Sequence, residues 1–148
     1  MARTRRRGRQ QDVLTDVLVL DAEGVSKAAS HDQSVQAWLE RARELDADIA
    51  VSAVTVAEVV RGTARDARVN RVLKAADLRP AAEPLARHAG RLVGRARSDA
   101  TIDALVAATA LAAIEGNGTA GRCVLLTSDP RDLRTLLTGE PRIKVIAV

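Results

Sequence analysis

The chain has 148 residues and a net charge of +4, most of it from arginine, which suits bidentate contacts with phosphate. This length suits one domain with a buried core. Trp38 is the only aromatic residue. That disfavours single-strand binders such as RRM or OB folds, which stack bases on aromatic side chains. Cys123 is the only cysteine, so the sequence excludes a disulfide and a cysteine metal cluster.

Residues 1–15 form an arginine-rich extension that we expect to be disordered, ahead of a single domain at residues 16–148. The extension is either an arm that attracts phosphate or sequence upstream of the true start codon, and we favour the second. It lacks the apolar segment of a signal peptide. The longest uncharged apolar run, residues 104–114, is shorter than the roughly 20 residues that span a bilayer. We therefore expect a cytoplasmic protein with no membrane segment.

The first predicted element is a strand at residues 17–20, where four consecutive apolar residues indicate burial on both faces. Apolar periodicity then predicts helices at 24–29 and 33–45, a strand at 49–54, helices at 55–62 and 64–75, and a short edge strand at 77–80. The same periodicity predicts helices at 84–97 and 102–115, a strand at 122–127, a helix at 129–137 and a strand at 143–148. Strands that alternate with helices predict βαβ units and a mainly parallel sheet.

Several turn and packing features accompany these elements. His31 falls in a turn between two predicted helices. Gly90 and Gly94 lie in the apolar stripe of the helix at 84–97 and indicate close approach of a second helix. We expect the helix at 102–115 to end at residues 116–118 in the left-handed conformation that glycine and asparagine favour.

Four acidic residues occupy equivalent places in this arrangement. Asp21 follows the first strand, and Glu58 lies one turn into the helix after the second. Asp103 lies in the first turn of the helix at 102–115, and Asp129 follows the strand at 122–127. In a parallel sheet, strand ends and the starts of the following helices share one edge. Three of these acids therefore converge by topology, and Asp103 joins them if its helix begins at that edge.

Each acid also has an ordinary structural interpretation. Asp21 and Asp129 are good helix caps. Thr55 and Glu58 have the spacing of a capping box. Asp103 complements a helix dipole. Taken singly, each of these interpretations explains its residue as well as a functional site does.

Asp103 is the hardest of the four to explain by structure alone. The helix that it begins is strongly apolar, and no Lys or Arg lies within one turn of it. A buried carboxylate is costly unless a partner meets it, so a metal ion is a natural partner. Carboxylate ligands select Mg²⁺ or Mn²⁺, while His31 and His88 are too isolated for a zinc site. No glycine-rich phosphate-binding motif is present.

Four segments, in this order, resemble the PIN-domain ribonucleases, and most closely the VapC-like toxins of type II toxin–antitoxin modules. They are residues 17–21 (VLVLD), 56–62 (VAEVVRG), 102–110 (IDALVAATA) and 126–130 (LTSDP). The similarity covers nearly all of the chain from Val17 to Val148. The second and third segments are the most specific part of the resemblance.

The resemblance implies a single PIN-like α/β domain with a sheet of about five strands in the order 3-2-1-4-5, flanked by helices. It also implies metal-dependent cleavage of RNA with Mg²⁺ or Mn²⁺, a small VapB-like antitoxin as partner, and a homodimer. The catalytic and metal-binding residues that it implies are Asp21, Glu58, Asp103 and Asp129. The auxiliary pocket residues are Asp99, Thr127, Ser128 and Asp132, and the RNA-binding residues are Arg61 and Arg131.

Three alternatives stay open from the sequence. A phosphotransfer enzyme also places an Asp after its first strand, but the chain has Asp21-Ala22-Glu23 rather than the Asp-x-Asp of the dehalogenase-like phosphatases. A catalytically silent PIN-like scaffold would bind RNA or protein without cleaving it. A housekeeping RNA-processing nuclease would share the site but not the antitoxin. The short single-domain chain favours the toxin.

Overall fold

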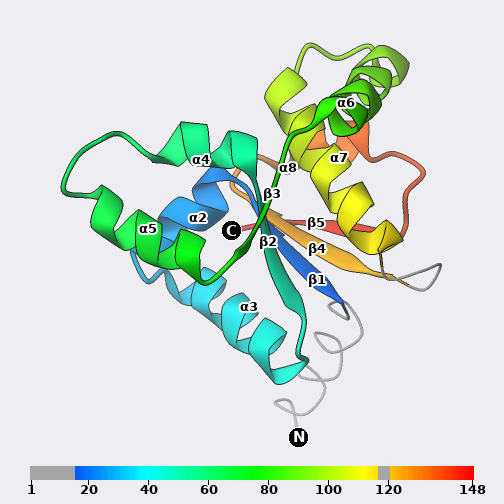
Figure 1. Ribbon diagram of the computed structural model, residues 1–148. Coiled ribbons are helices and arrows are strands. Elements are labelled where there is room, and N and C mark those ends of the chain that lie inside the picture. Colours follow the sequence, from blue (N-terminus) through cyan, green and yellow to red (C-terminus); the bar gives the residue numbers. More distant parts are fainter. Residues whose placement is uncertain (1–15, 117–120) are drawn as a thin grey trace, which may run out of the picture.

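The computed structural model describes residues 16–116 and 121–148, so the arginine-rich extension lies outside it. The described residues form one five-stranded sheet flanked by seven helices (Figure 1). All strand pairs are parallel and the order is β3-β2-β1-β4-β5, which confirms the expected α/β fold. The strands are β1 (Val17–Leu20), β2 (Asp48–Ser52), β3 (Asp77–Arg79), β4 (Cys123–Thr127) and β5 (Ile143–Ala147).

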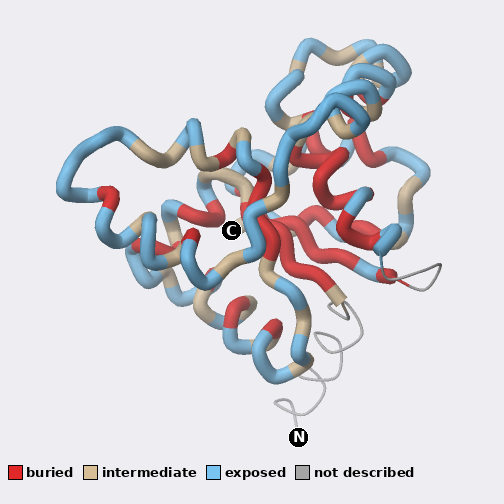
Figure 2. Tube along the Cα trace, in the orientation of Figure 1, coloured by how far each residue is buried: buried red, intermediate tan, exposed pale blue. Residues whose placement is uncertain are grey.

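Strand β1 is central and pairs with β2 on one side and β4 on the other. Every residue of β1 and β4 is buried, as the red strands in Figure 2 show. Helices on both faces of a parallel sheet remove both faces from water. This explains why these strands appear in the sequence as continuous apolar runs rather than alternating ones.

The helices form two layers, one on each face of the sheet (Figure 1). They are α2 (Ala22–Ala29), α3 (Gln33–Glu44), α4 (Ala53–Val59), α5 (Asp66–Lys74), α6 (Glu83–Ala96), α7 (Thr101–Glu115) and α8 (Pro130–Leu136). Val17 and Val19 face the core built with α6, α7 and α8, whereas Leu18 and Leu20 face the core built with α2, α3 and α5. This alternation follows from the two-residue period of a strand.

Helix α7 is the most buried helix of the fold, with Ala104, Ala107, Ala108 and Ala110 fully or almost fully enclosed. A helix that is apolar on all sides belongs in a core. Its small side chains let it approach the sheet closely, which suits a chain without Phe or Tyr. None of the helices in the described residues is long and apolar enough to cross a bilayer.

One detail of the sequence interpretation is wrong. Gly90 and Gly94 lie on the exposed side of α6, and a Cβ atom at either would meet nothing within 4 Å, so no second helix of the described residues approaches there. The buried residues of α6 are Ala89 and Leu92. The C-cap of α7 is Gly116, with φ −62°, and the residues after it at which we expect the left-handed conformation lie outside the described range. His31 does occupy a turn, with φ 58°.

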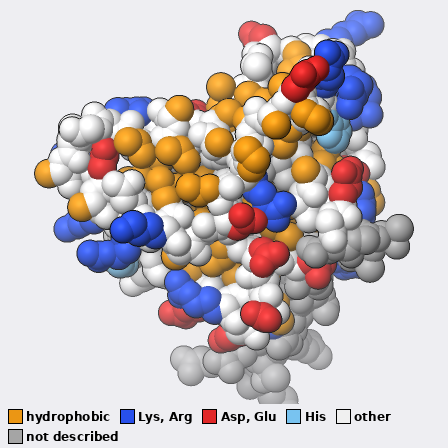
Figure 3. All heavy atoms as spheres, in the orientation of Figure 1, with side chains coloured by type: hydrophobic (Ala, Val, Ile, Leu, Met, Phe, Trp, Pro, Cys, Tyr) orange, Lys and Arg blue, Asp and Glu red, His pale blue; other side chains and the backbone are white. Residues whose placement is uncertain are grey.

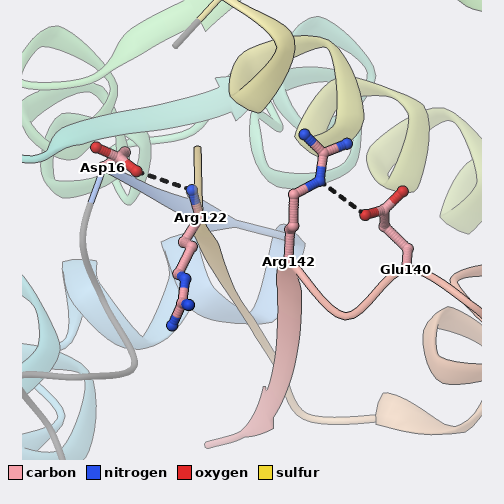
Figure 4. Close-up of polar contacts among 4 residues, drawn as sticks. All are labelled: Asp16, Arg122, Glu140 and Arg142. Carbon is pink, nitrogen blue, oxygen red and sulfur yellow. Dashed lines mark hydrogen bonds and ion pairs between the residues drawn. The ribbon is translucent and has the colours of Figure 1, made fainter. Parts of the chain in front are cut away.

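Polar contacts hold the strands together at the amino edge of the sheet (Figure 4). The Asp16 carboxylate accepts a hydrogen bond from the Arg122 backbone N–H at 2.8 Å, which joins the starts of β1 and β4. Arg142 and Glu140 form an ion pair of 3.0 Å just before β5. The charged groups at this edge therefore serve the fold by fixing strand ends.

Candidate metal centre

At the opposite, carboxyl edge of the sheet, strand register places Asp21 next to Ser52 and Thr127. Leu20 pairs with Val51 in β2 and with Leu126 in β4, so the residues that follow all three strands emerge at one level. Asp21 is the N-cap of α2, and its Oδ1 accepts a hydrogen bond from the Gly24 N–H at 2.9 Å. The cap interpretation of Asp21 is therefore correct.

Gly24 is what allows α2 to begin so close to the strands. A Cβ atom at this position would lie 3.2 Å from the Leu20 Cβ and 3.3 Å from the Leu126 carbonyl oxygen. Both distances are tighter than an ordinary contact. The close approach keeps Asp21 half-buried, and this burial raises the pKa of its carboxyl, although a hydrogen bond with the Thr127 side chain acts to lower it.

Glu58 lies near the end of α4, and its setting differs from the one predicted. The predicted strand at residues 49–54 ends earlier, at Ser52, which caps α4 by accepting from the Val54 N–H at 3.3 Å. Thr55 is therefore inside the helix, and the capping box with Glu58 does not form. Burial raises the pKa of Glu58, and the charges of Asp21 and Asp103 raise it further, while the charge of Arg61 lowers it.

Asp103 lies in the first turn of α7, which has no side-chain cap. Its carboxylate makes no hydrogen bond or ion pair with any other described residue. Burial raises its pKa, and the charges of Asp132, Asp21 and Asp129 raise it further. The helix does begin at the carboxyl edge, as the convergence argument required, and the acids there are close enough to repel one another.

Asp129 and its neighbours complete this edge. Asp129 is exposed and caps α8, accepting from the Arg131 N–H at 3.5 Å, and its own N–H donates to the Thr127 hydroxyl at 3.2 Å. Thr127 is buried between β4 and the Asp129 turn, whereas Ser128 is exposed. Asp132 lies in the first turn of α8 and acts on Asp103 through its charge.

The charges of these acids act on one another at this edge: those of Asp21 and Asp103 reach Glu58, and those of Asp132, Asp21 and Asp129 reach Asp103. Asp99 is not among them, because it is exposed and is not one of the charges that raise the pKa of Asp103. Its backbone oxygen accepts from the Thr101 N–H at 2.8 Å.

The two predicted RNA-binding arginines differ in how they are held. Arg61 follows α4, and its guanidinium donates to the Ala57 and Val60 carbonyls at 3.1 and 2.9 Å. Arg131 is exposed on α8. Arg61 is thus close enough for its charge to act on Glu58, and Arg131 follows Asp129 and Pro130 at the start of α8.

The donor set of this edge fits a hard divalent cation. All of its ligating groups are oxygens, and the carboxylates of Glu58 and Asp103 have no cationic ion-pair partner in the described residues. In the described part of the chain no three His, Cys, Asp or Glu side chains are already gathered as metal ligands. Mutually repelling carboxylates are stabilised by a cation placed between them.

Two further residues near the site were not predicted from the sequence. Asp66 is buried and accepts from the backbone N–H groups of Arg61, at 3.1 Å, and Gly62, at 2.7 Å. It thereby fixes the loop between α4 and α5, where Gly62 has φ +73°. The spacing Arg61-Gly62-x-x-x-Asp66, an acid that follows a glycine turn, is the signal that could have revealed it.

The second unpredicted feature is Thr55, whose hydroxyl is fully buried without a hydrogen-bond partner. Thr55 and Glu58 are three residues apart and share a side of α4. A buried polar group without a partner costs about 1–3 kcal/mol.

We therefore expect Thr55→Val, which keeps the shape of the side chain and removes the hydroxyl, to raise the free energy of unfolding by about 1 kcal/mol in urea denaturation. An unchanged or lower value would show that the hydroxyl is satisfied in solution.

The fold and this edge define a class, a parallel α/β domain that presents a cluster of carboxylates where its strands end. The sequence matches the PIN domain family over residues 7–135, which is most of the chain. The chain belongs to the PIN domain family. The structure confirms the fold and the strand order that the resemblance implied.

Two solved structures show the same fold. One is VapBC2 from Rickettsia felis bound to a DNA fragment from their promoter, with a TM-score of 0.65 and 16% identity, covering 89% of this chain and 98% of that one. The other is a toxin–antitoxin complex from Klebsiella pneumoniae, with a TM-score of 0.63 and 18% identity, covering 88% and 99%. A comparison with curated proteins finds no match.

Proposed function

We propose that this PIN domain is a metal-dependent endoribonuclease that hydrolyses phosphodiester bonds of RNA. The observation that carries the proposal is the mutual influence of four acids near one sheet edge. Burial raises the pKa of Glu58 and of Asp103, and the charges of Asp21 and Asp103 raise it further at Glu58, as those of Asp21 and Asp129 do at Asp103. This mutual repulsion destabilises the folded protein in the absence of metal, and a cation bound by the carboxylates would offset it. Membership of the PIN family supports the same conclusion.

The residues of the site would have different roles, according to where each lies. Asp21, Asp103 and Asp129 would hold Mg²⁺ or Mn²⁺ through carboxylate oxygens. When bound, such a cation activates water and offsets the negative charge that develops on a phosphodiester during attack. Glu58, which is exposed on α4, would either bind the cation or orient the attacking water. Thr127 lies beside Asp21 and its side chain acts to lower the pKa of that carboxyl, and Ser128 and Asp132 would line the pocket.

Arginines at the rim would hold the substrate. An acidic pocket repels a phosphate backbone, so RNA binding needs cations beside it. Arg61 has a guanidinium fixed against the end of α4, and Arg131 follows Asp129 at the start of α8. These two residues would place the backbone across the acidic edge.

We further propose that the protein is the toxin of a toxin–antitoxin pair, held inactive by a small VapB-like antitoxin, and that it acts in the cytoplasm as a homodimer. Support comes from the two solved structures, one a VapBC2 assembly and the other a toxin–antitoxin complex. The short chain, which spans nearly the full length of both matched chains, also supports it.

The test is cleavage of a mixed RNA pool by purified protein, with Mn²⁺ or Mg²⁺ and with EDTA. We expect discrete cleavage products with the metals and none with EDTA. Cleavage that persists in EDTA would contradict a metal-dependent mechanism. A folded protein that binds Mn²⁺ but leaves every RNA in the pool intact, when free of any co-purified partner, would favour the silent scaffold instead.

A further inference from the structure

A groove lies between α2 and the segment that joins α4 to α5, outside the acidic edge. Its main cavity has a volume of about 810 Å³. One wall is made of small residues of α2 and its end, Ser26, Ala29 and Ser30, and the other carries Arg61, Arg65 and Arg68. A second cavity of about 250 Å³ adjoins it, shares Ala29 and Arg68, and adds Arg71. We call the two together the α2–α5 groove.

The groove is strongly cationic. Arg65, Arg68 and Arg71 are exposed and make no ion pair with any described residue. The only acid in its lining is Asp66, and its carboxylate is already bonded to the backbone N–H groups of Arg61 and Gly62. On the face drawn in Figure 3, Lys and Arg side chains gather over the α5 region. The groove therefore keeps a net positive charge, because the single carboxylate of Asp66 faces four arginines.

Three of the arginines also lie in a row along one helix. Residues three apart lie on one side of a helix, so Arg65, Arg68 and Arg71 follow one another along α5. They span about 9 Å of helix axis, which is long enough to meet more than one phosphate of a strand. The small side chains of the α2 wall let a backbone approach these guanidinium groups closely.

One end of the groove meets the proposed active site. Arg61 lines the groove, and its guanidinium donates to the carbonyl of Ala57, the residue before Glu58, at 3.1 Å. Val59, the residue after Glu58, lines the same cavity. A strand whose scissile phosphate lies at the acidic edge has to continue past it, and the α2–α5 groove is a cationic path that starts there.

We propose that the α2–α5 groove binds the sugar–phosphate backbone of single-stranded RNA on one side of the cleavage point, with Arg65 and Arg68 as its phosphate contacts. The proposal rests on the proposed function for the identity of the strand, but its test does not depend on cleavage. An acidic segment of a protein partner is the competing occupant. The continuity with Glu58 through Arg61 favours the nucleic acid strand, because the reacting phosphate and the groove then belong to one ligand.

The test is fluorescence anisotropy of a short, labelled, single-stranded oligouridylate with the full chain in EDTA, over a series of salt concentrations. The groove variant is Arg65→Gln/Arg68→Gln. The matched control is Arg91→Gln/Arg95→Gln on α6, which removes the same charge from exposed residues outside the groove. We expect the groove variant to raise Kd about tenfold and to lower the salt slope of log K by about 1.4, against little change in the control. Thermal unfolding verifies that both variants fold.

Equal binding by the groove variant and the control would overturn the proposal. Tighter binding of polyglutamate of the same charge than of the oligouridylate would also overturn it, since that result marks a site for an acidic protein segment.

A failure of the proposed function would give a different result. Binding through Arg65 and Arg68 without metal-dependent cleavage of any RNA would retain the groove and reject the nuclease. Metal-dependent cleavage with unaltered binding in the groove variant would reject the groove alone.

Discussion

Asp21→Asn is expected to abolish RNA cleavage while making the metal-free protein more stable. Asparagine caps a helix as well as aspartate does, so the hydrogen bond from the Gly24 N–H is kept. What is lost is the negative charge that would bind the cation, and we expect cleavage to fall by about 10³-fold or more. Because burial raises the pKa of Asp21, removing its charge at neutral pH should raise Tm.

The matched control is Asp32→Asn, the same change at the N-cap of α3. Asp32 accepts from the Ser34 hydroxyl and from the Ser34 and Val35 N–H groups, and these bonds lower the pKa of its carboxyl. This variant should keep full cleavage and show no gain in Tm. A destabilised Asp21→Asn, or one that still cleaves RNA, would show that the carboxylate serves the fold rather than the reaction.

The second large effect concerns pH and metal together. The pKa values of Asp21, Glu58 and Asp103 are raised in the folded protein. The folded state then holds protons that the unfolded state releases. Stability from these groups is therefore fully present below about pH 4 and is lost as the pH rises through the raised pKa values. In EDTA, the stability advantage of Asp21→Asn over wild type should accordingly grow with pH across this window.

Adding Mn²⁺ at neutral pH should reverse this loss in the wild type. A ligand that binds only the folded state stabilises it by about 2.7 kcal/mol at a hundred times its Kd. Urea denaturation with and without Mn²⁺ measures the gain, which should shrink strongly in Asp21→Asn and persist in Asp32→Asn. A wild-type gain that is equal in Asp21→Asn would place the cation elsewhere on the chain.

Most of the fold could be predicted because its strands are buried on both faces. The runs at 17–20 and 122–127 are apolar throughout, and the alternation of strands with helices indicates a parallel sheet. The strand order came from the resemblance, because periodicity says nothing about which strands are neighbours. The exposed β3, only three residues long, could be recognised only as a weak edge strand.

Boundaries and local contacts were harder to predict. The start of α4 was misplaced because Ser52, Thr55 and Glu58 all carry capping chemistry, and only the strand register decides that Ser52 is used. Glycines in a helix were interpreted as packing sites, yet Gly90 and Gly94 face solvent.

The acidic site was predictable as a set of strand ends. Asp21, Glu58 and Asp129 could be assigned to one edge from topology, whereas Asp103 joined them only on the condition that its helix begins there. The charges that raise the pKa of Asp103 are consistent with that condition. The bonds of Asp66 could not be assigned in the same way, because they depend on the conformation of a loop around Gly62. The free arginines of α5 in the groove likewise became visible only once α2 was placed opposite them.

The central claim is that acids from separate elements form one cation site, and a Mn²⁺ titration followed by electron paramagnetic resonance tests it most directly. We expect wild type and Asp32→Asn to bind Mn²⁺ alike, and Asp21→Asn and Asp103→Asn each to weaken binding at least tenfold. If the two carboxylates share one ion, each substitution by itself should weaken Mn²⁺ binding. A wild type that binds no Mn²⁺, or variants that bind it as tightly as wild type, would contradict the account.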